Sequence, residues 1–288
     1  MSESNVCKGT LVLPLEKSSF ESFFCLASYL SPAALEKWRE TYLHSAEFME
    51  YENLVNSRRK HAYLLRNYCT KHAILRCLGK SLSYAKNLYI YNYITSQNIL
   101  TSDRLYYARL QVNITHSETL GFAVAFEGLY PLGIDIERIS IEKTQSIERL
   151  LSSHEENLIK TDIRENIITA LWTAKEALCK ALGGGLSVFS EVTVISEIFS
   201  YDNYKEVFFT HFPGYRAYCF SLDHYILTIA FPYYRRFQID VNKIWEKLNM
   251  ITNNQREEYG VKDRNQNYER SLLTYKLFSN QKLSPIKS

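Results

Sequence analysis

The sequence predicts an α+β protein with two lobes of comparable size. The chain has 288 residues, which at about 150 residues per domain means two lobes or one large domain. Helix-like and strand-like patterns both occur in each half. Hydrophobic residues make up 46% of the chain, and there are only 10 Gly and 6 Pro, so a sizeable core is available and collagen-like or Pro-rich chains are excluded.

The first half starts with helix and continues with strands. Residues 32–78 are rich in Leu, Ala, Glu and Arg and contain no Gly or Pro after Pro32, which predicts helix, and Gly79 predicts its end. Clusters of Tyr, Ile and other apolar residues separated by polar turns then predict three strands. These strands are expected at residues 88–94, 105–114 and 120–126.

The second half repeats both kinds of element. A strand is predicted over residues 132–137, and helical patterns follow at 146–159 and 166–182. A β meander comes next, with strands expected at residues 193–198, 206–212, 215–221 and 225–231.

The last fifty residues or so differ in composition from the rest. Residues 241–250 predict one helix, and residues 252–270 are rich in Asn, Gln, Glu and Arg, with few apolar side chains. The predicted division is therefore an N-terminal lobe at 1–127, a C-terminal lobe at 128–235, and a partly helical or mobile extension at 236–288.

Charge and apolar runs exclude several classes of protein. The net charge of +3 is too small to indicate nucleic-acid binding by itself. The apolar run from Phe23 to Leu30 is far shorter than the roughly 20 residues of a membrane span, and it lacks the basic start of a signal peptide. None of the six cysteines forms a CxxC pair. We expect a cytoplasmic protein with free thiols.

One strand carries two carboxylates on one face. In Gly133-Ile-Asp-Ile-Glu137 the side chains of Asp135 and Glu137 share a face at a spacing of about 6.6–6.8 Å. Two carboxylates repel unless a cation lies between them, and Mg²⁺ binds one or two carboxylates together with water and phosphate oxygens. Gly133 is expected to leave that face open for a ligand. The alternative is an amphipathic strand whose outer face is solvated.

A helix with a further carboxylate follows. Residues 170–182 predict a strong helix in which Glu176 and Lys180 lie one turn apart. Glu176 is the candidate third metal ligand, and lysines on this helix are candidates for phosphate contacts. The alternative is a surface ion pair worth about 0.3–0.5 kcal/mol.

A polar segment, Asn113-Ile-Thr-His-Ser117, is predicted to end a strand in a tight turn. His116 either binds a phosphate there or caps the turn.

Together these segments resemble the 4′-phosphopantetheinyl transferases, specifically the monomeric two-lobed type that modifies carrier domains of peptide and polyketide synthetases. The family pattern is Asn-hydrophobic-Ser/Thr-His-Ser, then Gly-hydrophobic-Asp-hydrophobic-Glu, then Trp/Phe-Ser/Thr-x-Lys-Glu-Ala/Ser-x-x-Lys. This chain has Asn113–Ser117, Gly133–Glu137 and Trp172–Lys180 in that order. The resemblance covers about residues 30 to 235.

The resemblance implies a pseudo-two-fold arrangement of two similar α+β lobes with the active site between them. It implies a cytoplasmic, monomeric, Mg²⁺-dependent transferase of secondary metabolite biosynthesis. Such an enzyme moves 4′-phosphopantetheine from coenzyme A to a serine hydroxyl of an acyl or peptidyl carrier protein and releases 3′,5′-adenosine bisphosphate. No nucleic acid or membrane takes part.

The resemblance also implies roles for individual residues. Asp135, Glu137 and Glu176 match the Mg²⁺ ligands, and Glu176 and Lys180 the catalytic residues, Glu176 as acceptor of the proton from the attacking hydroxyl. The implied coenzyme A contacts are Arg58, Arg59, Lys71, His116, Ser117, Lys175 and Lys180.

Two elements of the family pattern are replaced. Arg66-Asn67 stands where the family usually shows Gly-Arg, and a Gly-Lys-Pro turn is missing around Ser96-Gln97-Asn98. Both changes remove expected coenzyme A contacts, which motivates a second hypothesis: a homologue that binds coenzyme A or a carrier protein without transfer. A nucleic-acid binder is a third hypothesis, based on the pI of about 8.4 and on Arg58-Arg59-Lys60.

Overall fold

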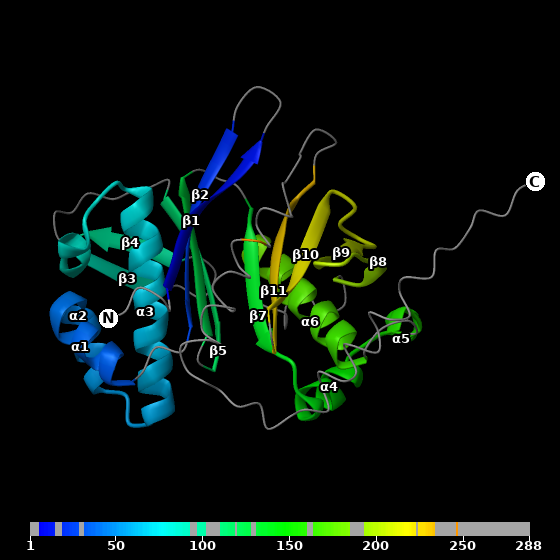
Figure 1. Ribbon diagram of the computed structural model, residues 1–288, viewed down its shortest axis with the longest axis horizontal. Coiled ribbons are helices and arrows are strands. Elements are labelled where there is room, and N and C mark those ends of the chain that lie inside the picture. The colour runs from blue at the N-terminus through cyan, green and yellow to red at the C-terminus, as the bar shows by residue number, and fades with distance from the viewer. Residues whose placement is uncertain are drawn as a thin grey trace, which may run out of the picture.

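A computed structural model describes residues 6–14, 19–28, 32–92, 97–101, 110–118, 120–127, 131–159, 164–184, 193–222, 224–233 and 246. These residues form an α+β fold of helices and antiparallel sheets, as predicted from the sequence (Figure 1). The two larger sheets stand next to each other in the middle of the molecule, and helices lie outside them.

The first sheet has the strand order β1-β2-β6-β5, and every neighbouring pair is antiparallel. Its strands are β1 (Val6–Pro14), β2 (Ser19–Ser28), β5 (Leu110–Ser117) and β6 (Leu120–Glu127). Helix α3 (Ser57–Cys77) covers its outer face and begins where the Asn56 side chain accepts from the backbone N–H groups of Arg58 and Arg59. The elements beside α3 are α1 (Pro32–Tyr42), α2 (Ser45–Glu52), the short 3₁₀ helix η2 (Leu82–Asn87) and the hairpin of β3 (Leu88–Asn92) and β4 (Gln97–Thr101).

The second sheet has the order β7-β11-β10-β9-β8 and is also antiparallel. Its strands are β7 (Gly133–Arg138), β8 (Ile195–Ser200), β9 (Tyr204–Phe209), β10 (Tyr215–Leu222) and β11 (Tyr225–Pro232). Helix α6 (Arg164–Ala181) packs on its outer face through Leu171, Ala174 and Leu178, at the helical spacing that the sequence predicts. The shorter α4 (Ile141–Glu148) and α5 (Ser153–Leu158) lie below α6 in Figure 1.

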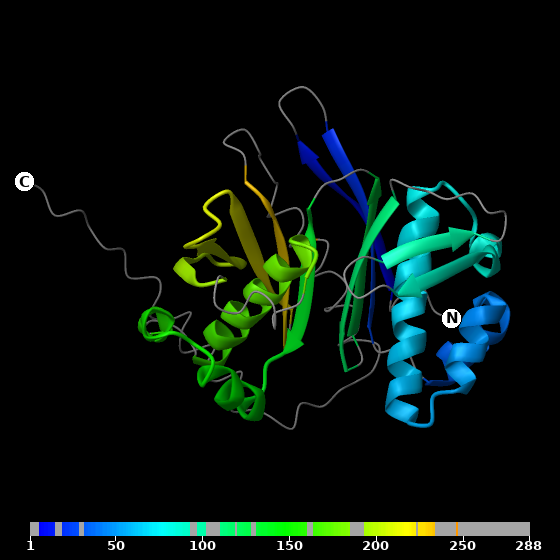
Figure 2. The same ribbon diagram turned by 180° about the vertical axis from the view of Figure 1, so that it is seen from behind.

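The inner faces of the two sheets share one apolar core. Phe122 of β6, Ile134 and Ile136 of β7 and Leu227 of β11 belong to the same buried cluster. The layers are therefore helix, sheet, sheet and helix, and the view from behind shows the same order (Figure 2). Every residue of β11 is buried because this strand has a neighbouring strand on each side, the first sheet on one face and α6 on the other.

Some elements differ from the sequence predictions. β1 and β2 were not predicted, because Lys8, Gly9 and Thr10 interrupt the alternation that marks a strand. The predicted helix at 32–78 is three helices. The predicted helix at 146–159 is two, because Ser140 caps the start of α4 and Ser152 forms a capping box with Glu155 at the start of α5.

Three further expectations concern the ends of the chain and membrane spans. The division into 1–127, 128–235 and 236–288 stays a prediction. The predicted helix at 241–250 lies outside the described residues apart from Glu246. Within the described ranges, none of the helices has the length and apolar character needed to cross a membrane.

Candidate active site

An open pocket of about 440 Å³ lies where α3, β5, β7 and α6 meet. It brings together three carboxylates and three basic side chains. These are Asp135, Glu137, Glu176, Arg66, His116 and Lys180. The structure thus gathers the three predicted metal ligands and the predicted Lys180 and His116 around one space.

Gly133 brings α6 close to β7. A Cβ atom at this position would lie 1.9 Å from the backbone oxygen of Ala177 and 2.5 Å from the backbone nitrogen of Ala181. Only glycine therefore lets the helix that carries Glu176 lie against the strand that carries Asp135. The expectation that Gly133 leaves this face open for a ligand is wrong, because the backbone of α6 fills the space.

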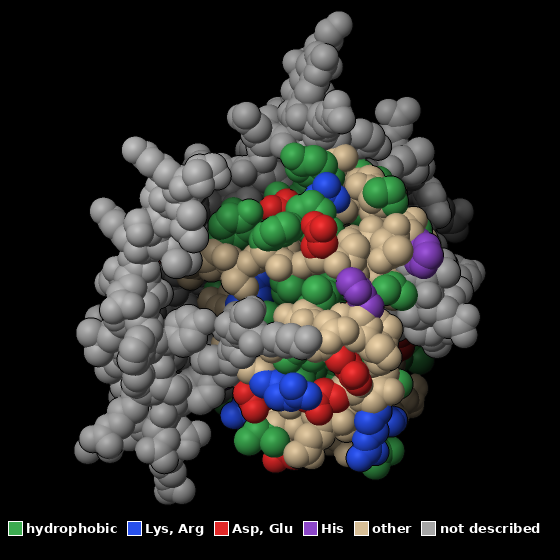
Figure 3. Space-filling view, turned by 90° about the vertical axis from the view of Figure 1, so that its right-hand side faces the viewer, with side chains coloured by type: hydrophobic (Ala, Val, Ile, Leu, Met, Phe, Trp, Pro, Cys, Tyr) green, Lys and Arg blue, Asp and Glu red, His purple; other side chains and the backbone are tan. Residues whose placement is uncertain are grey.

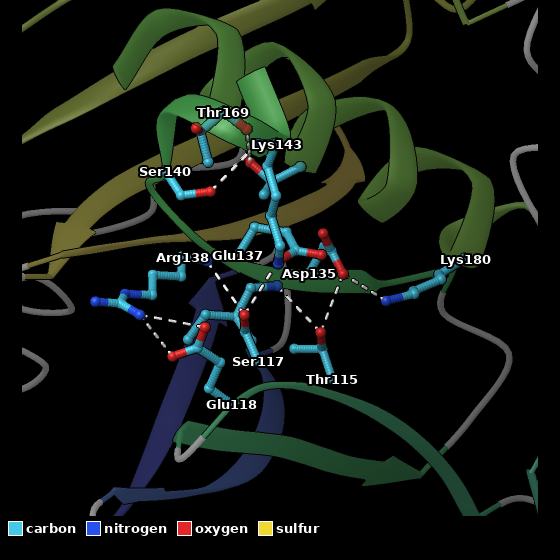
Figure 4. Close-up of polar contacts among 12 residues, drawn as sticks. Thr115, Ser117, Glu118, Asp135, Glu137, Arg138, Ser140, Lys143, Thr169 and Lys180 are labelled. Atoms are coloured by element: carbon cyan, nitrogen blue, oxygen red, sulfur yellow. Dashed lines mark hydrogen bonds and ion pairs between the residues drawn. The ribbon is translucent and has the colours of Figure 1, made fainter. Parts of the chain in front are cut away.

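Asp135 is buried, and only one of its two carboxylate oxygens accepts hydrogen bonds. Its Oδ1 accepts from Thr115 Oγ1 at 3.0 Å and from Lys180 Nζ at 2.7 Å (Figure 4). Its Oδ2 is buried without a hydrogen-bond partner. A buried carboxylate oxygen without a partner carries a large desolvation cost, which a bound cation would offset.

Glu137 lies two residues further along β7 and is more exposed. Its Oε2 accepts from Ser117 Oγ at 3.1 Å and from Lys143 Nζ, on α4, at 2.5 Å. The side chain of Glu137 is 26% exposed and that of Lys143 is 45% exposed, so water screens this ion pair.

Glu176 faces both of these carboxylates from α6. Burial raises the pKa of Glu176, the charge of Asp135 raises it further, Lys180 opposes the shift, and Glu137 adds to it. The three carboxylates therefore repel one another in the absence of a cation.

The donor set suits a hard cation. Among the described residues, no three His, Cys, Asp or Glu side chains are arranged so that together they could hold a metal ion, so Asp135, Glu137 and Glu176 do not form a preformed three-ligand site. Mg²⁺ needs no such site, because it binds one or two carboxylates and fills its octahedral shell with water and phosphate oxygens. Asp135, with its free Oδ2, together with Glu137 and Glu176, provides the carboxylate oxygens for such a site.

His116 lies on strand β5, which ends at Ser117 with a turn at Glu118, so the predicted strand end is confirmed, while residues 113–117 themselves belong to the strand. The imidazole is exposed at the mouth of the pocket. Desolvation by the surrounding protein lowers the pKa of His116, and the charges of Arg66 and Lys180 lower it further. The ring is therefore neutral at pH 7 and has one N–H group to donate.

Lys71 and Lys175, predicted to bind coenzyme A, do not line the pocket. Lys71 is completely buried, and its Nζ lies 2.6 Å from Glu47 and donates to two backbone oxygens. Lys175 lies 2.7 Å from the buried Glu155. Both amines are bound inside the fold, so both lysines are removed from the predicted coenzyme A contacts.

The predicted coenzyme A contacts of Ser117, Arg58 and Arg59 stay predictions. The Ser117 hydroxyl is engaged within the protein, donating to Glu137 and accepting from the backbone N–H of Arg138 at 3.2 Å. Arg58 and Arg59 are exposed on the first turn of α3 and do not line the pocket. Their contact with coenzyme A stays a prediction.

Arg66 and Thr115 are site residues that the motif comparison missed. Arg66 was taken as the loss of a contact, yet it lines the pocket from α3, with its guanidinium 5.2 Å from the centre of the Tyr63 ring. It follows Arg59 by seven residues, so helical periodicity would have placed it on the same face of the helix. Thr115 belongs to the Asn113–Ser117 motif, but no role was predicted for it, because the residue that its hydroxyl bonds lies in the other sheet.

One comparison with known proteins matches part of the chain. Residues 131–230 match the family model of the 4′-phosphopantetheinyl transferase superfamily, and this range includes β7, α4, α5, α6, β8, β9, β10 and most of β11. No curated protein matches the chain.

Proposed function

We propose that this chain transfers 4′-phosphopantetheine from coenzyme A to a serine hydroxyl of an acyl or peptidyl carrier protein, as an enzyme of the monomeric, two-lobed type. The observation that carries the proposal is the pocket itself. Three carboxylates within residues 131–230, which match this superfamily, face Lys180, Arg66 and the imidazole of His116, and Asp135 has a buried oxygen that lacks a partner.

Asp135, Glu137 and Glu176 are the residues that would hold Mg²⁺. When bound, Mg²⁺ would neutralise the charge of the coenzyme A diphosphate as the bond to the leaving group breaks. Without a cation, these carboxylates would repel the diphosphate, so the proposal requires a metal-dependent reaction.

The basic side chains surround the carboxylates. Lys180 holds Asp135 in place and adds a positive charge beside it, while Arg66 and His116 line the opposite side of the pocket from α3 and β5. Arginine suits phosphate because its planar guanidinium can donate two parallel hydrogen bonds. Positioning and charge account for most of the catalysis in phosphoryl transfer.

Glu176 is the proposed acceptor of the proton. The carrier serine oxygen forms a bond to the β-phosphorus, and the bond from that phosphorus to the bridging oxygen breaks. The serine proton passes to Glu176, directly or through a water molecule, and 3′,5′-adenosine bisphosphate leaves. The position of Glu176 in the pocket, beside Asp135 and Glu137, supports this role.

A second, mainly apolar hollow of about 350 Å³ adjoins the pocket and shares Glu137 and Trp172 with it. Ile147 and Leu150 line it, and Leu150 is 65% exposed. Ile141, at the start of α4, is 62% exposed. A carrier that rests on α4 would bring its serine next to Glu137, so we assign this surface to the carrier.

The test is the intact mass of an apo-carrier after incubation with this protein, coenzyme A and Mg²⁺. The expected result is a gain of one phosphopantetheine per carrier, together with release of 3′,5′-adenosine bisphosphate. A carrier with its serine replaced by alanine, and a reaction with a chelator, are the controls. No gain with several unrelated carriers would overturn the proposal.

The second hypothesis, binding without transfer, predicts heat of binding for coenzyme A by calorimetry and no change in carrier mass. This hypothesis was based partly on the replacement of the family's Gly-Arg by Arg66-Asn67, which was taken to remove a coenzyme A contact. Because Arg66 lines the pocket, that replacement is a weaker argument for it. The third hypothesis, nucleic-acid binding, rests on Arg58, Arg59 and Lys60 of α3 and predicts an affinity for DNA or RNA that falls steeply with salt. Figure 3 shows the opposite side of the molecule, where acidic, basic and apolar side chains are interspersed on the described part.

A further inference from the structure

Strands β5 and β7 belong to different sheets, yet side chains join them at regular intervals. Asn113 donates to the backbone oxygen of Leu132, Thr115 bonds Asp135, and Ser117 bonds Glu137. The partners advance along both strands in the same direction. β7 is an edge strand of the second sheet. In the described residues, side chains of β5 thus make hydrogen bonds to the backbone of β7 that a neighbouring strand would otherwise make.

The two hydroxyls make the same pair of bonds. Thr115 Oγ1 accepts from the backbone N–H of Ile136 at 3.1 Å and lies 3.0 Å from Oδ1 of Asp135. Ser117 Oγ accepts from the backbone N–H of Arg138 at 3.2 Å and lies 3.1 Å from Oε2 of Glu137. In each case the hydroxyl accepts from the residue after the carboxylate and donates to the carboxylate itself (Figure 4).

This pairing fixes the direction of each bond. A hydroxyl has one proton, and an N–H group can only donate, so the proton of each hydroxyl points at the carboxylate. At Asp135, the hydroxyl and Lys180 both engage Oδ1, and Oδ2 is left without a partner. The hydroxyls therefore set which oxygen of the carboxylate is turned away from the protein donors.

We infer that Thr115 and Ser117 are positioning residues, which hold the carboxylates of Asp135 and Glu137 in the orientation that binds a divalent cation. The inference rests on the proposed function for the role of that cation. Partners that orient metal ligands usually contribute 10–100-fold to metal affinity or activity. A role confined to joining the two sheets would change stability and leave cation affinity as it is.

Thr115→Val and Ser117→Ala separate these two roles. Valine has nearly the shape of threonine and lacks the hydroxyl, while Thr115→Ser keeps the hydroxyl and removes a methyl group. Thr144→Val is the matched control, because Thr144 is a buried threonine of α4 whose hydroxyl donates to the backbone oxygen of Ile141. The probe is Mn²⁺, which also prefers oxygen ligands, measured by the loss of the free-ion EPR signal on binding.

We expect Thr115→Val to weaken Mn²⁺ binding about tenfold. Ser117→Ala should weaken it less, because Glu137 is 26% exposed, so water can replace the lost hydroxyl more easily than at the buried Asp135. Thr115→Ser and Thr144→Val should bind Mn²⁺ within about twofold of the unchanged protein, even if thermal unfolding shifts. Equal Mn²⁺ affinity for Thr115→Val and the unchanged protein would overturn the inference. If Thr115→Val does not fold, unchanged affinity in Ser117→Ala would do the same.

Failure of the proposed function gives a different result. If the unchanged protein binds Mn²⁺ and the two variants bind it more weakly, but no carrier gains mass, the proposed function is wrong and the positioning role stands. If carriers gain mass, the half-saturating Mg²⁺ concentration should rise in Thr115→Val in step with the Mn²⁺ dissociation constant. An unchanged half-saturating concentration would contradict the positioning role.

Discussion

Asp135 and Glu137 each have a lysine partner, and the two ion pairs differ in exposure. In the pair of Lys180 and Asp135 the side chains are 29% and 8% exposed, and in the pair of Lys143 and Glu137 they are 45% and 26% exposed. Water screens the second pair more strongly, so the Lys143 ammonium separates from Glu137 more easily than the Lys180 ammonium separates from Asp135. Without a bound metal, the lysines compensate the carboxylates that would otherwise ligate it.

Lys143→Met should therefore tighten divalent cation binding. Lys143 competes with the cation for the carboxylate of Glu137, and an exposed ion pair is worth about 0.2–1 kcal/mol, so the Mn²⁺ dissociation constant should fall by a factor of about 1.4 to 5. Lys143→Arg keeps the charge and should leave the constant near its original value. Weaker binding in Lys143→Met would show that Lys143 supports the site instead of competing for it.

Asp135→Asn should abolish transfer and leave the fold intact. The change removes one negative charge next to the proposed cation and keeps the side-chain shape, so the rate should fall more than about 100-fold. Circular dichroism and a single cooperative thermal transition would confirm the fold. A folded Asp135→Asn protein with full activity would exclude Asp135 as a metal ligand.

Among the secondary-structure elements, the same kind of buried ion pair fixes each of the two long helices, α3 and α6. Glu47, in the capping box of α2, binds Lys71 of α3 and accepts from the backbone N–H of Ile90 on β3. Glu155, in the capping box of α5, binds Lys175 of α6 and accepts from the backbone N–H of Ile195 on β8. Each glutamate thus joins a short helix, a long helix and a strand.

Glu155→Gln should strongly destabilise the protein, because it leaves the buried amine of Lys175 without its carboxylate. Breaking a buried ion pair costs about 3–5 kcal/mol, and denaturant unfolding would measure the loss. Glu148→Gln is the control, since it removes an exposed pair with Arg164 and should cost no more than about 1 kcal/mol. Equal losses in the two variants would contradict the structural role of Glu155.

The pH dependence of stability should follow Glu155. Burial would raise the pKa of Glu155, but hydrogen bonds from Lys175 and from backbone N–H groups outweigh it, so the pKa is lowered from the ordinary value of 4.5. The contribution of Glu155 is therefore complete above about pH 4.5 and is lost as the pH falls through the lowered pKa. Thermal unfolding from pH 7 to pH 3 should show a smaller acid-induced loss in Glu155→Gln than in the unchanged protein.

These helices also show which features of the fold sequence patterns can predict and which they cannot. The periodicity of residues 166–182 predicted α6 and its buried face, because a helical pattern is local. The capping box of Ser152 and Glu155 is visible in the sequence, but its partner Lys175 lies twenty residues away, so its burial could not be predicted. Lys71 and Lys175 were assigned to coenzyme A because they match basic positions of the family pattern, and such a match does not show whether the amine faces solvent.

For the whole molecule, the central fact is that two sheets share one apolar core. The alternation in Gly133–Glu137 correctly predicted that Ile134 and Ile136 point one way and Asp135 the other. It could not show that the apolar face packs against the first sheet, nor that Thr115 and Ser117 meet the carboxylates there. Those contacts depend on the arrangement of the sheets, which no local pattern encodes.

The shared core predicts that residues 128–235 do not fold alone as a monomer. Without β6, the inner face of β7, β10 and β11 would lose its cover and expose a continuous apolar surface. This segment, produced by itself, should aggregate or self-associate when examined by size-exclusion chromatography with light scattering. A stable monomer with the thermal midpoint of the full chain would contradict the shared core.

The central claim is that this pocket transfers phosphopantetheine. The most direct measurement is the intact mass of one apo-carrier after equal incubations, with coenzyme A and Mg²⁺, with the unchanged protein and with Asp135→Asn. We expect a gain of one phosphopantetheine with the unchanged protein and no detectable gain with the variant. Equal gains with both proteins, or no gain with the unchanged protein on several carriers, would contradict it.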